Sequence, residues 1–233
     1  MSFFSAKDNG SNWFSRLALQ LHYDLPKGTG CRCVLVVTPT DSALAAYAAT
    51  HLAFSMGQEL NLKTLLIDTC SSSPQLSETL SCANMPGWAD LLNAPSMDIE
   101  RLILPSSSEN VKFLPAGDNG NILPPSEELQ ARLNAAREQY DFVILFGGAI
   151  DQDFKTLALL PYVGATLLLV AESETSADDL ASAREVLASF NAQNVRVVLT
   201  NRQRKGKAWL PERRSSAASA PTIASGWVPE RDT

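Results

Sequence analysis

The 233-residue chain has few of the residues that usually mark a metal centre, and it lacks the long apolar run of a membrane segment. It has two histidines and four cysteines, and no apolar run reaches the ~18 residues that a membrane-spanning helix needs. Cys31 and Cys33 form a C-x-C without a second Cys or His pair at zinc spacing, so we interpret the cysteines as reduced structural thiols. Lys and Arg number 19 against 25 Asp and Glu, and this net charge of -6 argues against a general nucleic-acid binder.

The region from residue 34 to residue 74 has the element order of a phosphate-binding fold. An apolar run at 34–37 predicts a strand, the alanine-rich stretch 43–56 a helix, and the run 64–67 a second strand that ends at Asp68. A working phosphate-binding loop reads G-x-x-x-x-G-K-[ST]. The loop here has no glycine, no lysine and no final hydroxyl, and consists of Pro39, Thr40, Asp41, Ser42, Ala43, Leu44, Ala45 and Ala46. We therefore predict a scaffold that is retained without its ATPase site.

Further apolar runs alternate with helical stretches along the rest of the chain. The runs do not alternate with polar residues, which is typical of parallel strands buried on both faces. The predicted fold class is therefore α/β, a doubly wound, mostly parallel sheet flanked by helices. The expected strands are 111–114, 142–146, 165–171 and 195–199, and the expected longer helices are 126–140 and 176–190.

Three segments are expected along the chain. Residues 1–12 are polar and predicted to be disordered, residues 13–201 form the α/β domain, and residues 202–233 form a basic, low-complexity tail. The basic part of the tail, which includes Trp209, is either a contact for an anionic membrane or acidic partner or a solvated linker. The amino terminus lacks the apolar core of a signal peptide, so a cytoplasmic location is expected.

Six short motifs follow one another at characteristic spacings. They are F-S-R-L at 14–17, H-L-A at 51–53, L-L-I-D at 65–68, G-W-A-D-L-L at 87–92, L-P-A-G at 114–117 followed by P-S-E at 125–127, and Y-D-F-V-I at 140–144. Together they resemble segments of the cytoplasmic tyrosine-autokinase modules that accompany bacterial exopolysaccharide and capsule export. Those modules belong to the ParA/MinD-type branch of P-loop ATPases, and the resemblance covers about residues 13–201.

The resemblance implies that the phosphate-binding residues have been lost. The family's phosphate-binding lysine falls on Ala45, its Mg²⁺-ligating hydroxyl on Ala46, and the glycine before them on Leu44. A phosphate cradle needs unhindered backbone N–H groups, which a leucine side chain would obstruct. Asp41 would add a negative charge to the cradle.

The acidic residues and the phosphate acceptors are mostly missing as well. The family's second acidic residue after the second strand falls on Cys70, and its Walker B aspartate falls on Phe146, so only Asp68 remains. One carboxylate does not make a Mg²⁺-ATP site. The chain also has no tyrosine after Tyr162, whereas the family carries a carboxy-terminal tyrosine cluster. The resemblance is therefore to a pseudokinase, with no catalytic, nucleotide-binding or metal-binding residue and no cofactor.

Several side chains leave two interpretations open. Asp68 is either a residual general base or metal ligand, or a strand-end carboxylate that hydrogen-bonds nearby loops, and we favour the second because it stands alone. His22 and His51 have no evident partner and are interpreted as structural. Gly147 and Gly148 either bind an anion or permit a tight turn.

The function that the resemblance implies is an accessory one. We expect a non-catalytic subunit of a bacterial exopolysaccharide or capsule-like export system, peripheral to the inner membrane through a polysaccharide co-polymerase, and in homo- or hetero-oligomers with an active homologue. The helix around Arg16 is the candidate contact surface. One alternative is a divergent ATPase or tyrosine kinase that uses ATP and Mg²⁺ with Lys63 or Lys155 as the phosphate ligand. The other is a nucleotide sensor or a ParA/MinD-like positioning protein.

Overall fold

The computed structural model describes most of the domain in several ranges. These ranges are residues 2–6, 11–25, 32–41, 43–70, 75–94, 96–118, 125–171 and 174–200, with only the backbone described for 2–6, 11–12, 43–44 and 154. The tail 202–233, with Trp209, lies outside them. No helix among these residues has the length and apolar character needed to cross a membrane.

One eight-stranded sheet forms the centre of the domain, in the order β1-β8-β7-β2-β6-β3-β5-β4. All neighbouring strands are parallel except the β4–β5 pair, which is antiparallel. The doubly wound, mostly parallel fold class is therefore confirmed. The strands are β1 Ser2–Ala6, β2 Cys33–Thr38, β3 Thr64–Asp68, β4 Leu104–Pro105, β5 Val111–Leu114, β6 Phe142–Ala149, β7 Ala165–Ala171 and β8 Val195–Thr200.

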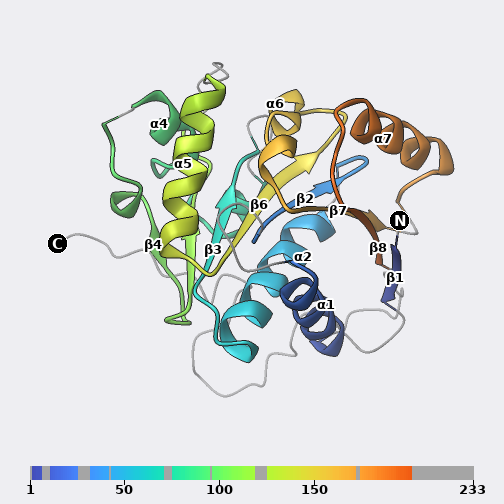
Figure 1. Cartoon of the computed structure of the whole chain (residues 1–233), viewed down its shortest axis with the longest axis horizontal. Coiled ribbons are helices and arrows are strands. Elements are labelled where there is room, and N and C mark those ends of the chain that lie inside the picture. Colours follow the sequence, from blue (N-terminus) through green and yellow to red (C-terminus); the bar gives the residue numbers. More distant parts are fainter. Residues whose placement is uncertain are drawn as a thin grey trace.

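Helices cover both faces of the sheet (Figure 1). One apolar core lies between the sheet and the helices α1, α2 and α3, and a second core lies between the opposite face and α4, α5, α6 and α7. The helices are α1 Ser11–Asp24, α2 Ala43–Phe54, continued by a π-helical turn Ser55–Glu59, α3 Gln75–Thr79, α4 Trp88–Asn93, α5 Ser126–Gln139, α6 Phe154–Leu157 and α7 Ala177–Ser189; short 3-10 turns are Ile99–Arg101 and Leu160–Tyr162.

The two cores explain why the central strands are continuously apolar. Successive side chains of a strand point to opposite faces, so Val34 and Val36 enter the α1-side core while Leu35 and Val37 enter the other. Every residue of β2, β3, β6 and β7 is buried. A polar residue at these positions would need a hydrogen-bond partner inside the protein.

The amino-terminal segment differs from the expectation of disorder over residues 1–12. Residues 2–6 form β1, which pairs in parallel with β8, with Phe4 opposite Val198, and α1 begins at Ser11. The physical reason is the free edge of β8, whose backbone groups need a partner. Because β1 pairs with β8, almost 200 residues further along the chain, the five residues of β1 carry no local sequence pattern that would predict this pairing.

A second difference concerns the end of β6. The sequence predicts that the strand stops before Gly147 and Gly148, yet β6 continues through both to Ala149. The register shift in the β2–β6 pair falls at this point, between Val36 and Val37 of β2. The two glycines are therefore part of the strand end, and not a loop beyond it.

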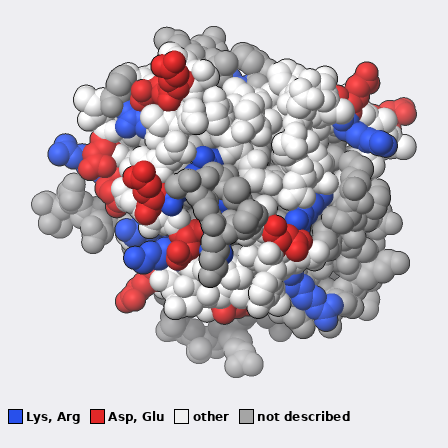
Figure 2. All heavy atoms as spheres, viewed as in Figure 1, with Lys and Arg blue, Asp and Glu red and all other residues white. Residues whose placement is uncertain are grey.

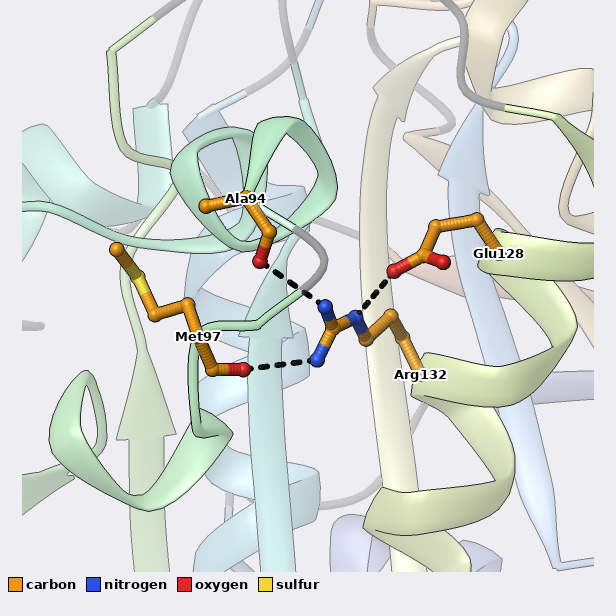
Figure 3. A network of polar contacts seen from close by, with 4 residues as sticks. All are labelled: Ala94, Met97, Glu128 and Arg132. Atoms are coloured by element: carbon orange, nitrogen blue, oxygen red, sulfur yellow. Dashed lines mark hydrogen bonds and ion pairs between the residues drawn. The ribbon is translucent and has the colours of Figure 1, made fainter.

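Arg132 of α5 fastens the segment after α4 to the domain (Figure 3). Its Nη1 donates to the Met97 carbonyl at 2.8 Å, its Nη2 to the Ala94 carbonyl at 3.0 Å, and its Nε to Glu128 Oε1 at 2.7 Å. Ala94 is the C-cap of α4, and its carbonyl also accepts the Met97 N–H at 2.9 Å, so the guanidinium adds a second donor at this helix end.

Replacement of Arg132 by alanine is expected to lower the free energy of unfolding by about 1–3 kcal/mol, because two charge-assisted hydrogen bonds to backbone carbonyls are lost. Urea denaturation followed by circular dichroism measures the change. Arg184→Ala, on the exposed side of α7, is the matched control and should change stability by less than about 0.5 kcal/mol. Equal effects of the two substitutions would contradict the role of Arg132 in holding the segment after α4.

Candidate functional site

The loop of residues 39–46, which lacks the phosphate-binding signature and is called the degenerate loop below, follows β2. It therefore lies at the carboxyl ends of the parallel strands, where α/β proteins bind their ligands. β2 ends at Thr38, whose hydroxyl donates to the Gly148 carbonyl at 3.3 Å, while the Ile150 N–H donates to the Thr38 carbonyl at 2.9 Å. Asp41 is exposed and accepts a hydrogen bond from the side-chain amide of Gln75 in α3. Ser42 lies outside the described residues. Polar contacts thus hold the chain just before the loop, at Thr38, and within it, at Asp41.

The positions at which the resemblance expects a lysine and a hydroxyl face the protein interior. Ala45 and Ala46, in the first turn and a half of α2, are 1% and 2% exposed and belong to the α1-side core. A methyl group suits this environment, whereas an ammonium group would lose its hydration there without a partner. Ala43 and Leu44 begin the same helix. Residues 43–46, the second half of the loop, are therefore the first turn of a packed helix.

Asp68 is fully buried at the end of β3, and neighbouring groups occupy both of its carboxyl oxygens. Oδ1 accepts the Cys70 N–H at 3.2 Å; Oδ2 accepts the Ser77 N–H at 2.8 Å and the Ser77 hydroxyl at 2.6 Å. Burial raises the pKa of Asp68 to about 6, although the hydrogen bonds from Ser77 and Cys70 oppose that rise. This geometry favours the structural interpretation, with the contacts made to the loop after β3 and to α3.

Phe146 and Cys70 fill the space where the resemblance expects two further carboxylates. Phe146 is fully buried and pairs with Asp68 across the β3–β6 register. The Sγ of Cys70 lies 2.7 Å from the place that a Cβ atom on Gly148 would occupy, and Gly148 has a φ of +68°. Glycine is required there by the backbone conformation and by the close approach of Cys70. This geometry explains the glycine at 148 within the end of β6, where the sequence predicted a turn or an anion site. Among the described residues, no group of His, Cys, Asp and Glu side chains could hold a metal ion.

His51 belongs to an aromatic cluster that joins α1 to α2. Its ring stacks on Phe14 with centroids 5.3 Å apart and lies 4.0 Å from the ring of Tyr47, while Trp13 meets Phe14 edge to face at 4.7 Å. Burial lowers the pKa of His51. These contacts agree with the structural role predicted for this histidine.

The two lysines considered as replacement phosphate ligands lie at different edges of the sheet. Lys63 precedes β3 and therefore lies at the amino ends of the strands, about 16 Å from the carboxyl end of β3 by the length of a five-residue strand. Lys155 follows β6, in α6, at the same edge as the loop. Of these two lysines, Lys155 is the one at the edge of the sheet that holds the loop.

Arg16 is exposed on α1, and two exposed apolar residues share its side of the helix. Leu19 and Tyr23, at three and seven residues from Arg16, are 43% and 77% exposed. We call this stripe of three residues the α1 stripe. From the sequence only Arg16 was predicted as a contact residue, although the 3.6-residue periodicity places Leu19 and Tyr23 opposite the buried Phe14 and Leu21. The role of Ser77 beside Asp68 was also missed, and it has no local sequence signal.

No protein-family profile and no curated protein sequence matches the chain. Solved structures do. The chimerical protein CapA2B2 has a TM-score of 0.70 at 19% identity, over 84% of this chain and 86% of that one. The kinase domain of the Escherichia coli tyrosine kinase ETK has a TM-score of 0.70 at 18% identity, over 87% and 80%.

A more distant structural neighbour is a ParA family ATPase from Chlorobium tepidum, with a TM-score of 0.59 at 19% identity, over 72% of this chain and 73% of that one. At these identities the similarity establishes the fold. The fold that the sequence motifs imply is therefore confirmed, with bacterial tyrosine kinase domains and ParA/MinD ATPases among the chains that share it.

Restoring the lysine at position 45 is expected to damage the fold and not to restore a site. Ala45→Lys places an unpaired ammonium in the α1-side core and should lower the free energy of unfolding by about 3–5 kcal/mol. Ala181→Lys, on the exposed side of α7, is the matched control and should leave the midpoint of thermal unfolding unchanged. An Ala45→Lys variant as stable as the control would show that this position opens to solvent.

Proposed function

We propose that the protein is a non-catalytic accessory subunit of a bacterial exopolysaccharide or capsule-like biosynthesis and export system. It docks on the cytoplasmic side of a membrane polysaccharide co-polymerase and is peripheral to the inner membrane through that partner. The observation that carries the proposal is the burial of Ala45 and Ala46 in an intact fold. A fold that is kept without its chemistry serves through its surfaces.

The electrostatics of the loop region support a role without nucleotide. Asp41 is exposed where phosphate groups would lie, and no described positive side chain contacts Asp68. Binding of ATP with Mg²⁺ depends on a lysine, a metal-ligating hydroxyl and acidic metal contacts acting together. The proposal therefore includes no cofactor.

The α1 stripe is the surface proposed for the partner. Exposed tyrosine and arginine side chains are enriched where proteins bind one another, because they combine a large contact area with hydrogen-bonding groups. The rest of α1 is anchored: Trp13, Phe14 and Leu21 are buried, and Asp24 pairs with Arg196 of β8 at 2.9 Å. The stripe thus stands on a rigid support. Homo-oligomers, or mixed oligomers with an active homologue, would use the same surface.

Nucleic acid is not proposed as a partner. On the face seen in Figure 2, positive side chains are interspersed with negative ones and form no continuous basic surface. The excess of acidic residues in the whole chain points the same way.

A divergent ATPase or kinase remains the second candidate because Lys155 lies at the same edge as the loop. Its N–H donates to Asp153 Oδ1 at 3.0 Å, which fixes the start of α6 beside β6. A nucleotide sensor or positioning protein would need the same edge. All these alternatives require nucleotide binding, which the proposed function does not.

Calorimetry with ATP and ADP in the presence of Mg²⁺ is expected to detect no binding at millimolar nucleotide, because the loop has no lysine and its final position, Ala46, has no metal-ligating hydroxyl. An active tyrosine-kinase homologue, measured under the same conditions, is the control. Micromolar binding would overturn the proposal, and loss of that binding in Lys155→Ala would assign it to the second candidate.

Substitutions in the α1 stripe are expected to weaken capture of the cytoplasmic region of the co-polymerase. Arg16→Ala and Tyr23→Asp should each raise the dissociation constant by about tenfold or more, which corresponds to about 1.4 kcal/mol. The matched control is Phe190→Asp at the end of α7, 51% exposed and on the opposite side of the sheet. Unchanged affinity in both stripe variants, with the fold intact by circular dichroism, would reject this surface.

A further inference from the structure

The buried carboxylate of Asp68 joins three parts of the chain at the edge that holds the degenerate loop. Ser77, in the five-residue helix α3, donates its N–H and its hydroxyl to Oδ2, and its oxygen accepts the Ala116 N–H at 2.9 Å. Ala116 follows β5 and Asp68 ends β3. The contact Asp68–Ser77–Ala116 therefore closes α3 over the ends of two neighbouring strands.

The carboxylate receives neutral partners only. Its hydrogen-bond donors are the two backbone N–H groups and the serine hydroxyl, and no described Lys, Arg or His contacts it. The titratable groups around it are Glu78 of α3, whose charge raises the pKa of Asp68 further, and the buried thiols Cys70 and Cys82. Burial, with Asp68 as a smaller cause, raises the pKa of Cys82 to about 12, so that thiol is neutral. The residues that meet Asp68 from β5 and β6, Ala116 and Phe146, do not titrate.

Ser77 can serve both protonation states of Asp68. In the structure its hydroxyl lies 2.6 Å from Oδ2, the length typical of a hydroxyl donating to a carboxylate. A hydroxyl oxygen has two lone pairs, so with a neutral Asp68 it can accept the carboxyl O–H and still accept the Ala116 N–H. The closed arrangement is therefore compatible with both states, but only the ionised state must bear a charge without water.

We propose that the Asp68–Ser77–Ala116 contact is a proton-operated latch, in which α3 is held closed when Asp68 is neutral and opens locally more often when Asp68 is ionised.

The direction follows from proton linkage. With α3 open and the carboxyl in water, the pKa of Asp68 returns towards 3.8, whereas in the closed state it is about 6. The closed state therefore binds the proton more tightly, and the opening equilibrium grows as the pH rises from about 4 to about 6 before it levels off. Neutral pH is the condition under which α3 is held least firmly.

Opening of α3 would change the surface beside the degenerate loop. Gln75, the first residue of α3, donates to Asp41 in that loop, so the loop loses this contact when α3 leaves. Cys70 and Cys82, both buried in the closed state, would become accessible. The latch goes beyond the proposed function, because it makes this edge responsive to pH whichever partner the protein has.

Hydrogen exchange of the amides of Ser77 and Ala116 tests the latch in the full chain. After correction for intrinsic exchange rates, the opening constant of these amides should rise by roughly ten- to thirtyfold between pH 4.5 and pH 7.5. Amides of α7, which has exposed carboxylates, provide the internal reference and should show no such rise. An opening constant that stays level or falls over this range would overturn the proposal.

Two variants separate the latch from a general loosening of the fold. Asp68→Asn keeps the shape of the side chain and removes the proton, so the rise between the two pH values should disappear. Ser77→Ala keeps the carboxyl but removes its strongest donor, so α3 should open more at pH 7.5 while the rise persists; Ser182→Ala, exposed on α7, is its control. A rise in Asp68→Asn equal to that of the natural chain would reject the latch.

Carboxyl carbon NMR of the natural chain gives an answer that needs no variant. The Asp68 signal should titrate well above the ordinary aspartate range, near pH 6. A midpoint near 4 would overturn the proposal even if Asp68→Asn failed to fold.

Discussion

Burial of the central strands on both faces is the constraint on which the rest of the structure depends. β2, β6 and β3 lie side by side in the middle of the sheet, and every one of their residues is enclosed by helices. Strands of this kind accept almost no polar residue, and their parallel direction brings their carboxyl ends to one edge. The degenerate loop, Asp68 and Gly148 meet there for that reason.

At this edge, packing has taken the place of charge. Where the resemblance expects a lysine, a hydroxyl and two carboxylates, the chain has two buried methyl groups, a thiol and a phenyl ring. All four groups are part of the α1-side core. The α1 stripe proposed as a docking surface stands on the other side of the same helix from this core.

Asp68 is the exception to that replacement. A carboxylate without a positive partner costs free energy when buried, and the three hydrogen bonds from neutral groups offset only part of the cost. In the proposed latch, the protonation state of this residue decides how firmly α3 is held. The same residue thus links the ends of β3 and β5 to the small helix α3 through Ser77.

The sequence by itself determined the layers of the fold and the absence of a phosphate-binding loop signature at 39–46. Continuous apolar runs at 34–37, 64–67 and 142–146 need burial on both faces wherever they lie, and a missing lysine is visible without coordinates. Only the tertiary structure decided that β1 pairs with β8, that Ser77 closes on Asp68, that Lys63 lies at the far edge, and that Leu19 and Tyr23 stay uncovered. Those facts are contacts between distant segments, and they depend on strand order and helix placement, which local composition does not encode.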